Sequence, residues 1–301
     1  MLLLLPAAWP RGSMAAAMAF LAVVCAAAMA AVSGAEEVYE FGSGASFIFG
    51  DSLVDAGNNN YIPSLSKANM TPNGIDFAAS GGMPTGRFTN GRTIADIIGE
   101  MLGQTDYSPP FLAPNTTGGA LLNGVNYASG GAGILNGTGR IFRLYTLDAR
   151  KFVVANVGPL GCIPYQKTIN RVGENECVKL PNQLASQYNG RLRELLIQLN
   201  GDLAGAKFCL ANVYDLVMDV ITNYDSYGFE TASMACCGNG GTYDGMVPCG
   251  PASSMCGDRK SHVFWDPYHP SEAANLVMAK YIVDGDSKYI SPMNLRKLFS
   301  L

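Results

Sequence analysis

Two segments far apart in the sequence carry side chains that could together perform acyl transfer. The chain contains two histidines, and one of them, His269, follows Asp266 by three residues in the run DPYHP at positions 266–270. A carboxylate at that spacing can lie on the same loop and hold one ring nitrogen of the imidazole, which leaves the other nitrogen to take a proton from a hydroxyl group. Taken alone, the run is equally compatible with a proline-rich turn that caps the next helix.

The candidate nucleophile is Ser52, which follows an apolar run at 46–49 and the pair Gly50-Asp51. A serine directly after a strand and a tight turn is held at the carboxyl edge of a sheet, where its own N–H can face a developing oxyanion. This is not the G-x-S-x-G elbow, and the alternative is that Asp51 or Ser52 only caps the following segment. Ser52 with His269 and Asp266 would form an acyl-enzyme without a metal or an organic cofactor.

The elements that must position these side chains alternate along the chain. Apolar, β-branched runs predict strands at 46–49, 121–128, 151–157 and 207–214. Helical spacing predicts helices at 96–102, 183–199 and 271–283, the last with Ser271 as its N-cap. Alternation of this kind predicts a parallel sheet with helices on both faces. Ligands bind such sheets beyond the carboxyl ends of the strands, and the glycine-rich and polar segments follow the strand candidates.

Five blocks in the same order resemble the plant GDSL esterase/lipase family of the SGNH hydrolase superfamily. FGDSLVDAGNN at 49–59, GVNYASGGAG at 124–133 and DPYHPSE at 266–272 are similar to its first, second and last blocks, and GRFTNGR at 86–92 and NVGPLGC at 156–162 are also similar. The resemblance implies an α/β fold, a flavodoxin-like three-layer α/β/α sandwich with a mostly parallel sheet. It also implies hydrolysis of carboxylic esters, with a small-molecule or lipid ester as substrate.

The resemblance assigns roles residue by residue. Ser52 matches the nucleophile and one oxyanion donor, Asp266 and His269 match the acid and the base, and Gly130 matches the oxyanion glycine, with Gly131 as the alternative register.

The sequence departs from the family at its third block, Gly-x-Asn-Asp, which is absent. We interpret residues 36–301 as a single hydrolase domain with an internal deletion near 142–143 that removes this block and a central strand. Such a chain would lose one oxyanion donor and part of its strand ladder, so poor folding or inactivity is expected. One hypothesis is that residues 151–157 slide into the vacant strand position and bring Asn156 near Ser52. The alternative is that Asn156 keeps its place one strand further out.

The N-terminus predicts export. Arg11 precedes a nearly uncharged apolar run at 14–32 and small residues at 33–35, the pattern of a signal peptide spanning residues 1–35. An N-terminal membrane anchor is the alternative, and no later segment is apolar enough to span a bilayer. We therefore expect a secreted protein of the cell wall or apoplast. The sequons at Asn69, Asn115 and Asn136 fit glycosylation.

The cysteines fit an oxidising compartment. Of eight, Cys25 lies in the predicted signal peptide, and the other seven remain. Cys162 could pair with Cys177, and Cys209 is expected to be buried and unpaired. The remaining four, close enough to staple one loop, are Cys236, Cys237, Cys249 and Cys256. A zinc site formed by this cluster and His262 is a weaker alternative, because the spacing has no usual zinc signature.

Composition limits the partners. Charged residues make up 15% of the 301 positions and the net charge is −4, which gives no basis for binding nucleic acid or an anionic membrane surface. We expect a monomer that needs no cofactor. Three functions stay open: a secreted esterase or lipase, a catalytically impaired secreted glycoprotein that is a shortened isoform, and an acyltransferase in which an alcohol replaces water.

Overall fold

The central sheet is built around β2 (Lys207–Ala211), a strand that carries apolar side chains on both faces. The structure is a computed structural model that describes residues 45–133 and 149–301, all within one unit that begins at Ser43. β2 pairs in parallel with β1 (Lys151–Ala155) and antiparallel with β7 (Ile290–Ser291), which gives the strand order β1-β2-β7. Phe208 lies opposite Phe152, and their rings stack with centroids 4.4 Å apart.

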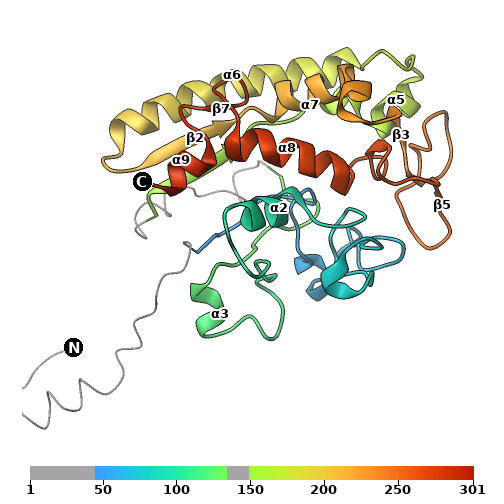
Figure 1. Cartoon of the computed structure of the whole chain (residues 1–301). Coiled ribbons are helices and arrows are strands. Elements are labelled where there is room, and N and C mark those ends of the chain that lie inside the picture. Colours follow the sequence, from blue (N-terminus) through green and yellow to red (C-terminus); the bar gives the residue numbers. More distant parts are fainter. Residues whose placement is uncertain (1–44, 134–148) are drawn as a thin grey trace, which may run out of the picture. The chain divides into compact units, whose positions relative to one another are not determined.

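Alternate side chains of β2 enter two different cores. Phe208 and Leu210 pack with leucines of α6 (Lys179–Asp202) on one face. Cys209 and Ala211 pack on the other face with residues of α7 (Val213–Thr222), α8 (Glu272–Asp284) and α9 (Leu295–Phe299). Because successive side chains of a strand point to opposite faces, helices cover both sides of the sheet (Figure 1). The expected α/β fold, with helices on both faces of a mostly parallel sheet, is confirmed.

Shorter elements lie before and after this sheet. The N-terminal part of the described chain contributes two α-helices, α2 (Ile94–Met101) and α3 (Gly119–Leu122). The region between α6 and the C-terminus adds four short strands, of which β3 pairs with β6 in parallel and β4 with β5 antiparallel. The remaining bounds are α5 (Pro164–Asn170), β3 (Thr231–Ala235), β4 (Cys237–Gly238), β5 (Ser254–Met255) and β6 (His262–Phe264).

The helices expected at 96–102, 183–199 and 271–283 are present as α2, α6 and α8. Ser271 caps α8 as predicted, because its hydroxyl oxygen accepts a hydrogen bond from the Ala274 N–H at 3.1 Å. β1 and β2 form within the strands expected at 151–157 and 207–214. β2 ends before 214 because the Asn212 side chain caps α7 by accepting from the Asp215 N–H.

The strand expected at 121–128 is wrong in its first half. Residues 119–122 form α3 instead, and Gly124 then takes a φ of 104°, a conformation that favours glycine. A side chain there would also lie 2.5 Å from the Ser46 carbonyl oxygen. Extended pairing begins only after this turn, where Ile48 forms a parallel bridge with Asn126.

The sheet is divided into two parts. Within residues 45–133 and 149–301, no strand ladder joins the Ile48–Asn126 pair to β1, and β1 pairs with β2 alone. Apolar side chains of both parts are exposed: Phe49 retains 54% of its accessible surface and Val153 retains 43%. This division is the arrangement expected of a chain without a central strand, because each neighbour then keeps an unpaired edge.

The expected disulfides are present. Cys162 bonds to Cys177, and the four clustered cysteines form two further bonds, Cys236–Cys256 and Cys237–Cys249. Cys209 is free and buried, and burial raises the pKa of its thiol. The cysteine assignments made from the sequence are therefore confirmed.

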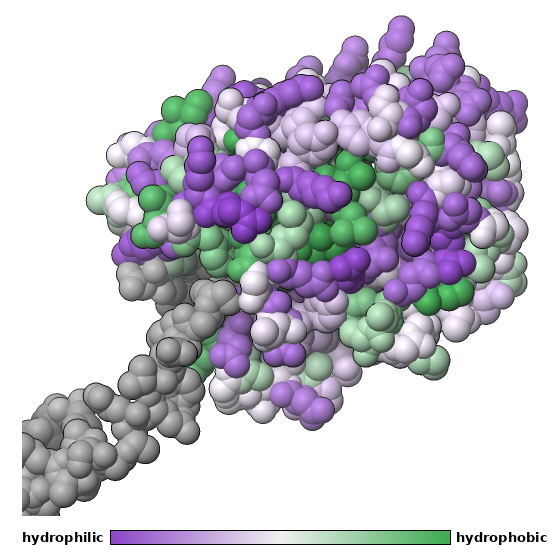
Figure 2. All heavy atoms as spheres, viewed as in Figure 1, coloured by the Kyte–Doolittle hydropathy of each residue, from purple (hydrophilic) through white to green (hydrophobic). Residues whose placement is uncertain are grey.

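The long helix α6 is solvated along its outer side. Its buried residues are Ala185, Asn189, Leu196 and Leu199, and Figure 2 shows hydrophilic residues along the edge of the molecule where Figure 1 places α6. In the described ranges, no helix combines the length and the apolar character needed to cross a bilayer.

The stacked pair Phe152–Phe208 provides a test of the sheet. Phe208→Ala removes a side chain that is 2% exposed and leaves a cavity between β2 and α6, so the free energy of unfolding should fall by about 3–5 kcal/mol. Urea denaturation followed by circular dichroism measures the change. Leu180→Ala on the exposed side of α6 is the control and should stay within about 0.5 kcal/mol of the wild type. Equal losses in both variants would contradict the packing described.

Candidate active site

The loop after β6 folds back on itself and brings a carboxylate under an imidazole. The Trp265 N–H donates to the His269 carbonyl oxygen at 2.8 Å, and Phe264 forms a bridge with Pro270. Asp266 Oδ1 accepts the backbone N–H groups of Tyr268 and His269, each at 2.8 Å. The two Asp266 carboxylate oxygens lie 2.8 and 2.9 Å from His269 Nδ1. Both residues are buried, so solvent competes little for this pair.

The second imidazole nitrogen meets a hydroxyl from the other end of the chain. His269 Nε2 lies 2.7 Å from Ser52 Oγ, across a sequence separation of 217 residues. Because an ionised carboxylate can only accept, Nδ1 carries the proton toward Asp266, and Nε2 is then the acceptor for the Ser52 hydroxyl. Ser52, Asp266 and His269, identified separately from the sequence, are thus brought into one continuous hydrogen-bonded chain.

The turn that presents Ser52 is held by Asp55, a fully buried carboxylate. Asp55 Oδ1 accepts the N–H groups of Gly57 and Asn58 at 2.7 and 2.8 Å, and Oδ2 accepts the Gly130 N–H at 2.9 Å. A buried carboxylate needs such donors because it has lost its hydration. Asp55 therefore joins the segment after Ser52 to the glycine-rich loop at 129–133.

Two asparagines extend this connection. Asn58 Nδ2 donates to the carbonyl oxygens of Asn126 and Ala128, both at 2.8 Å. Asn59 Nδ2 donates to the Gly130 carbonyl oxygen at 2.7 Å, and Asn59 Oδ1 accepts from the Ser129 hydroxyl at 2.6 Å. Neither asparagine was assigned a role of its own from the sequence. Their clustering beside Asp55 was the available signal, because such side chains readily hydrogen-bond to turns of the backbone.

The Gly130 N–H is engaged in the structure, contrary to the role that the resemblance gave it. It donates to Asp55 Oδ2 and so does not face solvent for a developing oxyanion. The adjacent Gly131 has a φ of 83° and, within the two described ranges, its N–H makes no hydrogen bond. In the glycine-rich loop, the Gly131 N–H rather than the Gly130 N–H is thus left without a hydrogen-bond partner among the described residues.

Asn156 does not join the site. Its backbone N–H donates to the Ala211 carbonyl oxygen, its side-chain amide donates to Asn212 Oδ1 at 2.8 Å, and its Oδ1 accepts from the Tyr214 N–H at 2.9 Å. These contacts occupy both ends of the side chain beside β2. The hypothesis that residues 151–157 slide toward Ser52 is therefore wrong for this structure.

The sulfurs of the cysteine cluster are bonded to one another. Cys236 and Cys256 lie near His262, and all three could approach a common ion, but Cys236 and Cys256 form a disulfide and provide no thiolate. His262 Nδ1 instead lies 3.1 Å from the Ser261 hydroxyl, and burial lowers the pKa of its imidazole. The cluster as it stands does not fit the zinc alternative.

The same cluster supports the loop that carries His269. The Cys236 N–H donates to the Phe264 carbonyl oxygen at 3.1 Å and the Cys237 N–H to the Trp265 carbonyl oxygen at 2.6 Å. Trp265 is fully buried among Cys236, Cys237 and Cys249. The disulfide-bonded segment therefore fixes the residue that immediately precedes Asp266.

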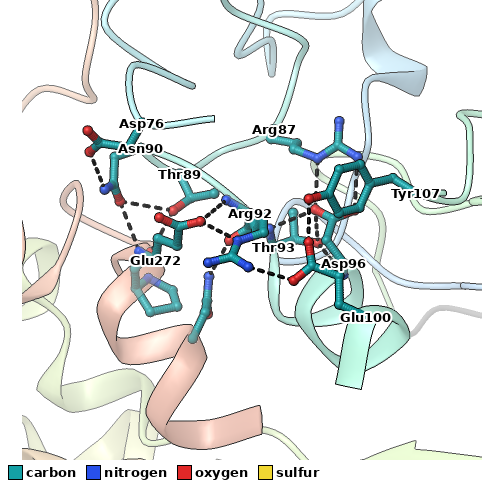
Figure 3. A network of polar contacts seen from close by, with 12 residues as sticks. Asp76, Arg87, Thr89, Asn90, Arg92, Thr93, Asp96, Glu100, Tyr107 and Glu272 are labelled. Carbon is teal, nitrogen blue, oxygen red and sulfur yellow. Dashed lines mark hydrogen bonds and ion pairs between the residues drawn. The ribbon is translucent and has the colours of Figure 1, made fainter. Parts of the chain in front are cut away.

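A polar network beside the site links α8 to the segment 85–92 (Figure 3). At one end, Asp76 accepts two hydrogen bonds from Arg259, each at 2.6 Å, and one from Asn90 at 2.8 Å. The Arg259 hydrogen bonds are the main reason that the pKa of Asp76 is lowered. The Asn90 side chain also accepts the Glu272 N–H at 2.9 Å, at the start of α8.

Comparison with known proteins identifies the family of the chain. The profile of the GDSL-like Lipase/Acylhydrolase family matches residues 139–282. Two Arabidopsis thaliana proteins, GDSL esterase/lipase At2g23540 and GDSL esterase/lipase At3g50400, are 54% and 48% identical, each covering 85% of this chain and 88% and 91% of the relative. A third, GDSL esterase/lipase At4g16230, is 41% identical over 85% of the chain and 91% of its own length. The chain belongs to the GDSL esterase/lipase family.

The ion pair between Asp76 and Arg259 predicts a dependence of stability on pH. Because the pKa of Asp76 is lowered in the folded state, its contribution is present above its usual value of 3.8 and is lost as the pH falls through the folded-state pKa. Asp76→Asn should lower the free energy of unfolding by up to about 1 kcal/mol at neutral pH, since the pair is partly exposed. Urea denaturation between about pH 7 and about pH 2 should show this difference shrinking below 3.8.

The matched control is Glu194→Gln, which removes an exposed carboxylate of α6. Its difference from the wild type should stay near zero at every pH. A difference for Asp76→Asn that grows as the pH falls would contradict the predicted direction.

Proposed function

We propose that this chain is a secreted serine esterase or lipase that hydrolyses carboxylic esters through Ser52, His269 and Asp266. The observation that carries the proposal is the continuous contact from Ser52 Oγ to His269 Nε2 and from His269 Nδ1 to Asp266. The names of the relatives, GDSL esterase/lipase, support the same class of reaction. The substrate is a small-molecule or lipid ester, and the reaction needs no cofactor.

The proposed reaction proceeds in two steps. His269 takes the Ser52 proton while Ser52 Oγ attacks the ester carbonyl, and the resulting oxyanion is stabilised by backbone N–H donors. His269 then protonates the leaving alcohol, and a water molecule, activated by the same imidazole, releases the acid from the acyl-enzyme. We assign the oxyanion donors to the N–H groups of Ser52 and Gly131, because the Gly130 N–H is occupied by Asp55.

Turnover of short p-nitrophenyl esters tests the triad. Ser52→Ala should reduce turnover to background, and Asp266→Asn should lower kcat by roughly ten-thousandfold because an amide no longer stabilises the imidazolium. A fluorophosphonate should label Ser52 in the wild type, with the labelled peptide identified by mass spectrometry. Labelling of another serine, or full activity in Ser52→Ala, would refute the assignment.

We further propose that the chain is a shortened form of a longer family member. The alignment with the first Arabidopsis relative extends over 340 positions, more than the 301 residues of this chain, so it includes positions where the relative has residues and this chain has none. The divided sheet and the absent Gly-x-Asn-Asp block support a loss of sequence before β1. The predicted junction at 142–143 lies outside the described residues. The missing sequence favours a second candidate function, that of a catalytically impaired secreted glycoprotein.

Restoring the missing segment separates the two candidates. Insertion at 142–143 of the corresponding residues of GDSL esterase/lipase At2g23540 should raise kcat by about a hundred- to a thousandfold, because it returns an oxyanion donor. The control is the same insertion with the asparagine of its Gly-x-Asn-Asp block changed to alanine. This variant should restore the stability of the fold but not the full rate. Equal activity of the short and the restored chain would contradict the impaired candidate.

Secretion is part of the proposal. The predicted signal peptide, residues 1–35, and the sequon at Asn136 lie outside the described residues, whereas Asn69 and Asn115 are exposed and accessible to a glycan. Three disulfides further support an oxidising compartment. We propose the cell wall or apoplast as the location and a monomer as the working form.

A further inference from the structure

We infer that the loop at residues 85–92 holds the Ser52 turn and the His269 loop in register, and that Asn90, Arg92 and Glu272 are positioning residues for His269. The inference rests on the proposed role of His269 as the general base. Ser52 and His269 come from opposite ends of the chain and are joined by one side-chain hydrogen bond, so something else must fix their separation. A misplacement of about 1 Å in such a pair can cost roughly a hundredfold in rate.

One end of the 85–92 loop contacts the turn after Ser52. Asn60 Nδ2 donates to the Thr85 carbonyl oxygen at 2.8 Å, and the Arg87 guanidinium reaches the Ala56 carbonyl oxygen at 3.4 Å. The backbones touch here, because a side chain on Gly86 would lie 2.6 Å from the Gly57 Cα. These contacts therefore fix this end of the loop relative to the segment that carries Ser52.

The other end contacts the segment directly after His269. The Thr89 hydroxyl donates to the Pro270 carbonyl oxygen at 3.3 Å, and Asn90 Oδ1 accepts the Glu272 N–H at 2.9 Å. The backbone N–H and the Nε of Arg92 both donate to Glu272 Oε1, at 3.0 and 2.6 Å. These contacts, most of them drawn in Figure 3, fix the first turn of α8, which begins three residues after the imidazole.

Between its two ends the loop touches the imidazole itself. The Phe88 ring lies 5.1 Å from the His269 ring, centroid to centroid. The same ring lies against the glycine-rich loop, since a side chain on Gly130 would meet it at 2.8 Å. The 85–92 loop thus contacts the nucleophile turn, the glycine-rich loop and the base.

The loop has a rigid anchor of its own. Arg87 and Asp96 form a buried, two-pronged ion pair, with N···O distances of 2.8 and 2.9 Å. Asp96 also completes the capping box of α2 by accepting the Thr93 N–H at 2.8 Å. Because the guanidinium geometry matches the carboxylate, this pair fixes direction as well as distance. The 85–92 loop is therefore held rigidly, so it can fix the positions of the segments that it contacts.

Variants of Glu272 test the inference. Glu272→Ala removes the acceptor of two Arg92 donors, whereas Glu272→Gln keeps an acceptor oxygen. We expect Glu272→Ala to lower kcat per folded protein by about 10- to 100-fold, with KM within about twofold, and Glu272→Gln to recover most of the rate. Asn90→Ala, which removes the acceptor for the Glu272 N–H and the Thr89 hydroxyl and the donor to Asp76, should act in the same direction.

The matched control is Asp284→Ala, which breaks the ion pair with Arg296 at the opposite end of α8 and should leave kcat unchanged. The ring-proton NMR signals of His269, assigned with His262→Gln, provide a readout independent of turnover. They should move in Glu272→Ala and Asn90→Ala but not in Asp284→Ala. Unchanged kcat and His269 signals in both test variants would overturn the inference. Absence of Ser52-dependent turnover in the wild type would instead overturn the proposed function, and the NMR comparison would still decide the role of the loop.

Discussion

The proposed chemistry depends on one hydrogen bond between residues 217 positions apart, the contact of Ser52 Oγ with His269 Nε2. Neither partner can hold the other, because a single hydrogen bond contributes only about 1 kcal/mol. Each side is therefore fixed locally: Asp55 organises the turn after Ser52, and Asp266 organises the loop that ends at His269. Both carboxylates are buried and satisfied by backbone N–H groups, so each loop has little freedom to choose another conformation.

The buried polar residues are the means by which separate loops become one site. The asparagines at 58 and 59 join the nucleophile turn to the glycine-rich loop, and the 85–92 loop joins it to the start of α8. The disulfide-bonded segment supports Trp265 from the other side. In this family member, polar contacts between loops thus join the parts of the candidate site.

The candidate triad is assembled although the sheet is divided. The β1-β2-β7 sheet has its own cores on both faces, whereas Ile48 and Asn126 pair apart from it within the described chain. The triad residues nevertheless meet, because the loops that carry them contact one another directly. The geometry of proton transfer and the completeness of the oxyanion site are therefore separate properties, and the proposed loss of the third block concerns the second.

The sequence by itself predicted the candidate triad and most of the regular elements. Ser52, Asp266 and His269 could be named because few residue types support acyl transfer and each sits in a distinctive local run. α2, α6, α8, β1, β2 and the Cys162–Cys177 pair could be predicted because periodicity, capping and spacing are local properties, whereas the pairing among the four clustered cysteines was left open. The short strands β3–β6 and the helix α5 were not predicted, since their patterns are too short to separate from loops. The helix α7 was also not predicted, although at ten residues it is longer than α2.

Only the tertiary structure decided which polar groups are occupied. The Gly130 N–H is taken by Asp55 and the Asn156 amide by Asn212, and residues 119–122 form a helix in place of the expected strand. The role of Asn90, Arg92 and Glu272 is also invisible in the sequence, where 182 positions separate Asn90 from Glu272. A hydrogen bond depends on the three-dimensional approach of two groups, and residue type and spacing report that approach only within one element.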